Sequence, residues 1–157
     1  MAKITFLNLG EVLEIHRDQM ARYGGLPGLR DLDLLKSAVA MPQATLDGEF
    51  LHTDIFEMAA AYLFHIIGNH PFLDGNKCAG AVACLVFLEL NGYEFTAPEK
   101  ELAEIVFALA RGEVSKADIA IFVRKWTVSV AHRKHKLPDS LALLRARSRA
   151  RGSRKCR

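Results

Sequence analysis

Two long apolar stretches joined by a short polar segment decide the fold of this chain: IFEMAAAYLFHIIGNHPFLDGNKCAGAVACLVFLEL, residues 55–90. Drawn as helices, both stretches are apolar almost all the way round, which is typical of helices buried at the centre of a bundle. Pro71 disfavours helical geometry at His70, so the first helix should end just before that residue. The second helix should begin near residues 74–77 and end at the Asn-Gly pair 91–92.

Shorter amphipathic helices are predicted around this central pair, because apolar residues recur there at helical spacing between polar ones. Capping residues, among them Asp31 and Ser115, mark their starts, and glycines and prolines help to mark their ends. Thr53 or Asp54 is expected to cap the first central helix in the same way. The amphipathic helices are expected over residues 10–23, 31–40, 99–112 and 116–133.

Two short β elements are also predicted. The Asp-Gly pair 47–48 lies between alternating apolar residues, which is a strong signal for a two-residue hairpin turn. We therefore expect a small flap over residues 43–51. Residues 93–96, YEFT, are expected to form a short strand beside residues 4–7, ITFL.

The resulting fold class is all-α: a helical bundle around a central buried helix pair, with a small β-hairpin flap. A length of 157 residues suits one core. We expect residues 1–131 to form this domain. Residues 132–157 are rich in Arg and Ser and lack a sustained apolar stripe, so we expect a basic, flexible C-terminal tail.

The net charge of +3 is unevenly distributed. Of the 21 Lys and Arg residues, 10 follow residue 131, where Asp139 is the single acid, so the tail carries +9 and the body −6. Such a split is typical of a basic appendage on an acidic domain, because a nucleic-acid-binding fold carries positive charge on its folded surface. Nucleic-acid binding is therefore disfavoured.

Cysteine usage and hydropathy favour a cytoplasmic protein. Cys78, Cys84 and Cys156 are odd in number and lack paired metal spacing, which supports neither a disulfide framework nor a zinc site. The N-terminus has acids where a signal peptide needs an apolar core, and the longest apolar run is too short to cross a bilayer. No membrane role is implied.

The polar segment between the two central helices combines groups that suit a bound phosphate. The second helix points unpaired backbone N–H groups at it, and such an end attracts anions. Gly75 allows close approach of a ligand to the backbone, Asn76 offers amide donors and Lys77 adds a positive charge. Together these residues predict a phosphate-binding cradle.

Two further residues extend this chemistry to phosphoryl or nucleotidyl transfer. Asp74 can bind a hard cation such as Mg²⁺ that bridges to the phosphates. His70 is close enough in sequence to deprotonate a hydroxyl brought to the bound phosphate. Phe72 should turn inward and anchor the segment to the core.

A purely structural interpretation of the same residues stays open. Asp74 can be a helix cap, Asn76 a turn residue, Lys77 a solvated lysine and His70 a satisfied loop histidine. Elsewhere the structural interpretation is favoured. It makes His65 a core histidine, His16 a helix-face residue, and Cys78 and Cys84 small buried hydrophobes.

HPFLDGNK, residues 70–77, resembles the signature loop of the Fic/Doc family: His-x-Phe-x-Asp/Glu-Gly/Ala-Asn, then Gly or Lys, then Arg. Lys77 resembles the Doc, or death-on-curing, branch. The resemblance covers about residues 4–128, since residues 9–45 and 87–115 also look like death-on-curing proteins.

The resemblance implies a Fic-type fold that binds ATP and Mg²⁺. Residue by residue, it implies that His70 is the catalytic base and Asp74 the Mg²⁺ ligand, with phosphates held by Gly75, Asn76 and Lys77, and Phe72 as the structural anchor. Doc-type members transfer the γ-phosphate of ATP to a hydroxyl of a translation protein, elongation factor Tu, whereas Fic enzymes transfer AMP. Doc-type members are toxins neutralised by a Phd-type antitoxin.

The sequence departs from the family signature at one position that matters. Cys78 and Ala79 stand where the family has Arg, usually followed by Thr. A charge-assisted hydrogen bond is worth about 1.5 to 3 kcal/mol, so its loss in the transition state slows transfer roughly 10- to 150-fold. An attenuated or inactive homologue that binds an antitoxin or a nucleotide is therefore an alternative.

Inhibition from within the chain is not supported by the sequence. A self-inhibitory helix of the Fic type needs Ser or Thr, three residues, Glu, and then Gly or Asn. Residues 45–49 fit this pattern until Phe50 breaks it. We therefore expect an external, Phd-like antitoxin.

Overall fold

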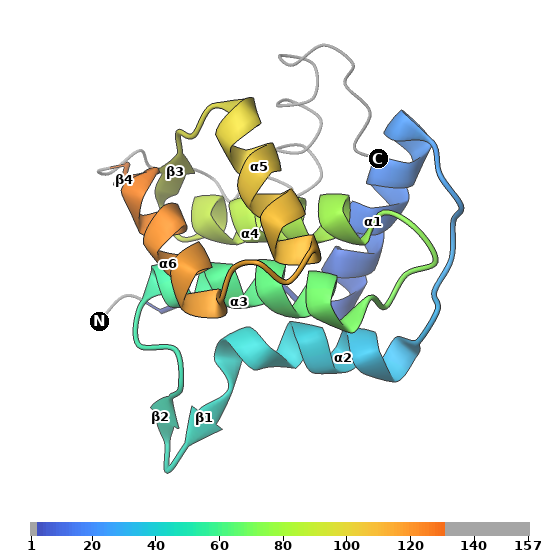
Figure 1. The fold of residues 1–157 in the computed structure, drawn as a ribbon. Helices are drawn as coiled ribbons and strands as arrows, with labels where there is room; N and C mark the ends of the chain where they lie inside the picture. Colours follow the sequence, from blue (N-terminus) through green and yellow to red (C-terminus); the bar gives the residue numbers. More distant parts are fainter. Residues whose placement is uncertain (1–2, 131–157) are drawn as a thin grey trace.

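The computed structural model describes residues 3–130, which form a helical bundle with two small sheets (Figure 1). Its α-helices are α1 (Leu9–Tyr23), α2 (Leu32–Ala40), α3 (Ile55–Asn69), α4 (Asn76–Leu90), α5 (Glu99–Ala110) and α6 (Lys116–Lys125). A 3₁₀ turn, η1 (Met41–Gln43), follows α2. The strands form two antiparallel pairs, β1 (Thr45–Leu46) with β2 (Glu49–Phe50) and β3 (Tyr93–Phe95) with β4 (Thr127–Ser129). The predicted fold class is confirmed, whereas the predicted tail, 132–157, lies outside the described residues.

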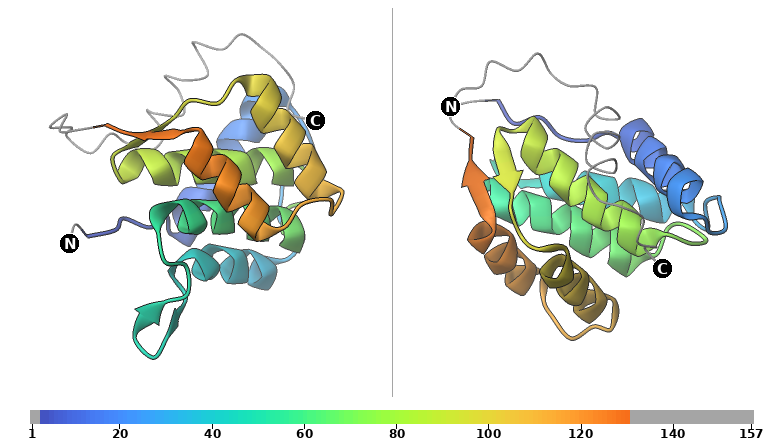
Figure 2. Two further views of the ribbon diagram at one scale, coloured as in Figure 1. Left: turned by 60° about the vertical axis from the view of Figure 1, so that its left-hand side comes forward. Right: turned by 90° about the horizontal axis from the view of Figure 1, so that it is seen from above.

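The α3–α4 pair is the centre of the bundle, as the two apolar stretches predict. The two helices pack on each other more extensively than any other pair of described elements. Gly80 allows this close approach, because a Cβ there would lie 3.2 Å from Cγ1 of Ile67. Helix α1 covers one side of the pair and α5 and α6 the other, while α2 packs against α3 (Figure 2).

Side-chain caps fix where several helices begin. The side chain of Asn8 accepts from the backbone N–H of Glu11, whose carboxylate accepts from Asn8 in return, and this capping box starts α1. Asp54, rather than Thr53, caps α3. Ser115 caps α6, as the sequence predicts.

Two predictions about the β structure and the last helix are wrong. Residues 93–95 pair with residues 127–129 and not with the N-terminal ITFL. The N-terminal segment instead bonds to a side chain: Asn91 Oδ1 accepts from Thr5 N at 2.8 Å and Asn91 Nδ2 donates to Thr5 O at 2.9 Å. The last helix ends at Lys125 instead of continuing to residue 133, because the β-branched residues that follow join β3 in a sheet.

Helix α3 separates the two features that the sequence singled out. The β1–β2 hairpin lies at its N-terminal end and the loop before α4 at its C-terminal end (Figure 1). A helix of 15 residues is about 22 Å long. Within residues 3–130, none of the helices has both the length and the apolarity needed to span a bilayer.

Candidate functional site at the α3–α4 loop

The α3–α4 loop, residues 70–75, is closed by the side chain of the residue that follows it. Asn76 is buried, its Oδ1 accepts from Phe72 N at 2.9 Å, and its Nδ2 donates to Phe72 O at 3.0 Å. Phe72 itself is fully buried. The carboxamide of Asn76 therefore holds the loop backbone, and what Asn76 presents outward is its backbone N–H.

Asp74 bonds on both sides of the loop. Its Oδ1 accepts from Gly75 N at 2.8 Å, and its Oδ2 accepts from Leu26 N, in the α1–α2 linker (residues 24–31), at 3.2 Å. Neither bond reaches into the first turn of α4, which no described side chain caps. The first backbone N–H groups of α4 therefore lie beside the Asp74 carboxylate without a side-chain cap from the described residues.

Gly75 sits where only glycine fits. Its φ of 79° is left-handed, and a Cβ there would lie 2.3 Å from Cε of Met20. Lys77 follows in the first turn of α4, with Nζ 5.7 Å from the centre of the Phe107 ring. The ammonium thus makes a cation–π contact with Phe107 close to the N-terminus of α4. This contact is weak, and a phosphate can replace it.

His70 is exposed at the start of the loop and has a left-handed backbone, with φ 49° and ψ 53°. Its carbonyl oxygen accepts from Nε of Arg30 at 2.6 Å. The structure therefore brings His70, Asp74, Gly75 and the start of α4 together in one exposed loop.

His16 belongs to this site, although the sequence analysis took it for a helix-face residue. Its ring lies flat on Phe72, with ring centres 3.7 Å apart and planes inclined by 3°, and Nε2 donates to the carbonyl oxygen of Asp74 at 2.8 Å. Burial lowers the pKa of His16, against an opposing pull from Asp74. His16 lies four residues before Met20, on the apolar stripe of α1. This spacing is the one sign in the sequence that His16 faces the interior of the protein.

The position of the missing arginine is filled by a small buried side chain. Cys78 is 1% exposed and lies in the first turn of α4. Cys84, six residues further along α4, is buried too, and burial raises the pKa of its thiol to about 12. Both cysteines are the small buried residues that the sequence predicts, and the side chain at position 78 supplies no cation.

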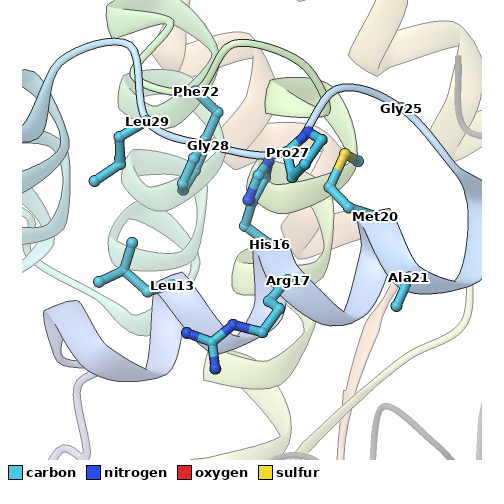
Figure 3. A pocket seen from close by; sticks show the side chains of 10 residues that line it. All are labelled: Leu13, His16, Arg17, Met20, Ala21, Gly25, Pro27, Gly28, Leu29 and Phe72. Atoms are coloured by element: carbon cyan, nitrogen blue, oxygen red, sulfur yellow. The ribbon is translucent and has the colours of Figure 1, made fainter.

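A groove of about 520 Å³ lies between α1 and the α1–α2 linker (Figure 3). His16 and Arg17 contribute its polar atoms, and the rest of its lining is mainly apolar. Three exposed leucines are close in sequence to residues that line the groove: Leu26, Leu32 and Leu73. The apolar part of the lining comes from Leu13, Met20, Ala21, Pro27, Leu29 and Phe72.

A second polar cluster lies at the other end of α3. Nζ of Lys116 is 3.1 Å from Nε2 of His52 and 3.4 Å from Nε2 of His65, beside a cavity of about 260 Å³ that Glu57 also lines. Burial, with further contributions from Lys116 and His52, lowers the pKa of His65 to about 4. Both imidazoles are therefore neutral acceptors for the Lys116 ammonium.

Comparison with known proteins establishes the family. The model of the Fic/DOC family matches residues 6–88, just over half of the chain, so the chain belongs to that family. Over 116 residues it is 35% identical to protein kinase doc of Escherichia phage P1, covering 73% of this chain and 90% of that protein. Over 75 residues it is 40% identical to toxin Doc of Mycolicibacterium smegmatis, covering 48% of this chain and 58% of that protein.

Proposed function

We propose that the chain is a Doc-like toxin that transfers the γ-phosphate of ATP to a hydroxyl of a translation protein of the elongation factor Tu class. The observation that carries the proposal is the N-terminus of α4, which is uncapped by described side chains and lies beside His70 and Asp74. The relatives named protein kinase doc and toxin Doc support the same reaction and the same biological role.

The residues of the loop suit a nucleotide triphosphate with Mg²⁺. Asp74 is exposed in the loop, and carboxylate oxygens are among the ligands that Mg²⁺ prefers. One carboxylate together with substrate phosphates is a common way to hold Mg²⁺. Gly75 supplies the left-handed turn before α4, and the backbone N–H groups of Asn76 and Lys77 with the Lys77 ammonium would hold the phosphate oxygens.

In the proposed reaction His70 accepts the proton of the target hydroxyl as that oxygen bonds to the γ-phosphorus. The bond from the γ-phosphorus to the bridging oxygen breaks, and ADP leaves. When bound at Asp74, Mg²⁺ would neutralise charge on the phosphates. The protein's share is to orient His70 and to present N–H groups and Lys77 to the transferred group.

Cys78 favours a second version of this proposal, an attenuated enzyme. The family's Arg offers two parallel donors to phosphate, and a buried cysteine offers none. A chain that binds ATP without transferring phosphate would act as a nucleotide- or antitoxin-binding module.

Transfer is tested by incubating the purified chain with Mg²⁺, elongation factor Tu and ATP labelled at either the γ- or the α-phosphate, with His70→Ala as the control. Label from γ alone, lost in the control, is expected. Label from α would identify an AMP transferase. No label from either position would favour the binding module and lead to Cys78→Arg as the next variant.

We also propose a Phd-like antitoxin as partner, bound at the groove along α1. An apolar groove with exposed leucines beside it is typical of a protein-binding surface. The antitoxin should therefore present apolar side chains there. Leu29→Asp is expected to prevent co-purification of the co-expressed antitoxin, whereas Val128→Asp, at an exposed apolar position on β4, is not.

A further inference from the structure

His70 has a backbone conformation that its own sequence context disfavours. Its φ is 49°, in the left-handed region that residues other than glycine rarely adopt. Pro71 further favours an extended conformation for the residue before it. Within residues 3–130, the other non-glycine residue with positive φ is Asp47, where the type of hairpin turn requires it. At His70 the conformation must be imposed by the surroundings.

Arg30 makes the contacts that can impose it. Its Nε donates to the carbonyl oxygen of His70 at 2.6 Å, and its Nη2 donates to that of Asn69 at 2.9 Å. These carbonyls lie at the C-terminus of α3, where the last C=O groups have no partners within the helix. The guanidinium fork therefore holds the orientation of two successive peptide groups, and its charge is favourable at a helix C-terminus.

The backbone of Arg30 is itself fixed against the loop. Arg30 N and Asp31 N donate to Pro71 O at 2.7 and 3.0 Å, and Leu73 N donates to Gly28 O at 3.1 Å. Figure 1 shows the α1–α2 linker running beside the α3–α4 loop. Because the backbone of Arg30 is fixed in this way, its guanidinium holds the carbonyl groups of residues 69 and 70 in one orientation.

We propose that Arg30 is a positioning residue for His70: it holds the left-handed conformation at residue 70 and so aims the imidazole at the site of the target hydroxyl. The catalytic part rests on the proposed function. If Arg30 is removed, the peptide between residues 69 and 70 is free to turn and His70 relaxes toward an extended conformation. The imidazole then changes its direction relative to the N-terminus of α4.

Two readouts test this proposal in the full chain, using Arg30→Ala and Arg30→Lys. Arg111→Ala is the matched control. Arg111 is an exposed arginine, far from Arg30 in the sequence, and it is paired with Glu113. The first readout is the intraresidue HN–Hα nuclear Overhauser effect of His70, which is strong at positive φ. The second is kcat and KM for phosphate transfer. Small displacements of a reacting group cost up to about 100-fold in rate.

The expected result is a weakened Overhauser effect at His70 in Arg30→Ala, with kcat lowered about 10- to 100-fold and little change in KM for ATP. Arg30→Lys, with a single ammonium, should recover part of both, and Arg111→Ala should change neither. An unchanged Overhauser effect in Arg30→Ala overturns the proposal, whatever happens to kcat. A wild type without transfer would contradict the proposed function alone, because the Overhauser effect still decides the role of Arg30.

Discussion

The two ends of α3 are held in different ways. At the C-terminal end, side chains bond to backbone: Asn76 to both polar groups of Phe72, and Arg30 to the carbonyls of residues 69 and 70. At the N-terminal end, Asp54 also bonds to backbone as the cap of α3, but the side chains that tie this end to the rest of the bundle bond to one another: Lys116 to two histidines, and Arg124 to Asp54. Bonds to backbone fix the path of the chain, so the first end suits a site that must keep its shape.

The hairpin end is correspondingly less constrained. The β1 and β2 strands have two residues each, and all four are exposed. Leu46 and Phe50 are apolar and exposed, although the Phe50 ring lies 5.7 Å from that of Phe6. Few buried contacts and a short ladder predict low local stability.

The largest effect is expected from breaking the loop closure with Asn76→Ala. The change leaves the N–H and C=O of Phe72 buried without partners, which costs about 2 to 5 kcal/mol of the free energy of unfolding. Urea denaturation measures it. Asn69→Ala is the matched control, since the Asn69 side chain donates one hydrogen bond, to Leu34 O, and its loss should cost about 1 kcal/mol. Equal costs for the two variants would mean that the bonds of Asn76 to Phe72 stabilise the fold no more than an ordinary side-chain hydrogen bond.

Two glycines allow the two ends to be compared directly. Gly75 in the loop and Gly48 in the hairpin have φ of 79° and 83°, but an added Cβ meets Met20 at Gly75 and open space at Gly48. Gly48→Ala should cost about 1 kcal/mol through backbone strain alone. Gly75→Ala should cost about 2 to 4 kcal/mol, because overpacking adds to the strain. Urea denaturation measures both costs. If Gly48→Ala costs as much as Gly75→Ala, the loop is no more tightly packed than the hairpin, and the proposed difference between the two ends of α3 is refuted.

Restoring a charge at the loop end should raise activity. Cys78→Arg is expected to accelerate phosphate transfer roughly 10- to 150-fold and to make expression toxic, because a guanidinium again reaches the phosphates. Cys78→Ala is the control, since it keeps a small buried side chain and adds no charge. The measurement is single-turnover transfer to elongation factor Tu. A rate no higher than that of the control would sink the prediction.

The smallest effect concerns pH at the hairpin end. The pKa of His65 is about 4 in the folded protein, chiefly through burial and then Lys116, against an ordinary value of 6.5. Between these values the unfolded chain binds more protons, so stability should fall as pH falls from 6.5 to 4. The loss should be about 1 to 2 kcal/mol, since water screens the half-exposed ring.

Lys116→Met tests the cause of this shift. Removing the ammonium should raise the pKa of His65 toward its ordinary value, although burial still lowers it. The pH-dependent loss of stability should then shrink. Nuclear magnetic resonance titration of the His65 ring in both proteins gives the answer, and a wild-type ring that titrates near 6.5 would contradict the account.

The sequence predicted what local patterns determine. The central helix pair follows from two apolar runs, and the starts of α2 and α6 follow from Asp31 and Ser115 as caps. The hairpin follows from its Asp-Gly turn. Asp47 and Gly48 both have the positive φ that such a turn requires.

Features that depend on distant residues were missed. Arg30 lies 40 residues from His70, and Lys116 lies 51 residues from His65, so no local spacing relates them. The pairing of β3 with β4 was missed for the same reason. The bonds of Asn76 to Phe72 are local, but the sequence leaves open whether an amide binds a ligand or its own loop, and the choice depends on burial of the loop.

The central claim is that the N-terminus of α4 binds the phosphates of ATP, and calorimetric titration with Mg²⁺ and ATP tests it most directly. We expect binding by the wild type, weakened at least about tenfold in Asp74→Asn and Lys77→Met, because each removes a charged contact. Lys100→Met, an exposed lysine paired with Glu104 on α5, is the control and should bind like the wild type. Absence of binding, or equal affinity in all four proteins, would contradict the claim.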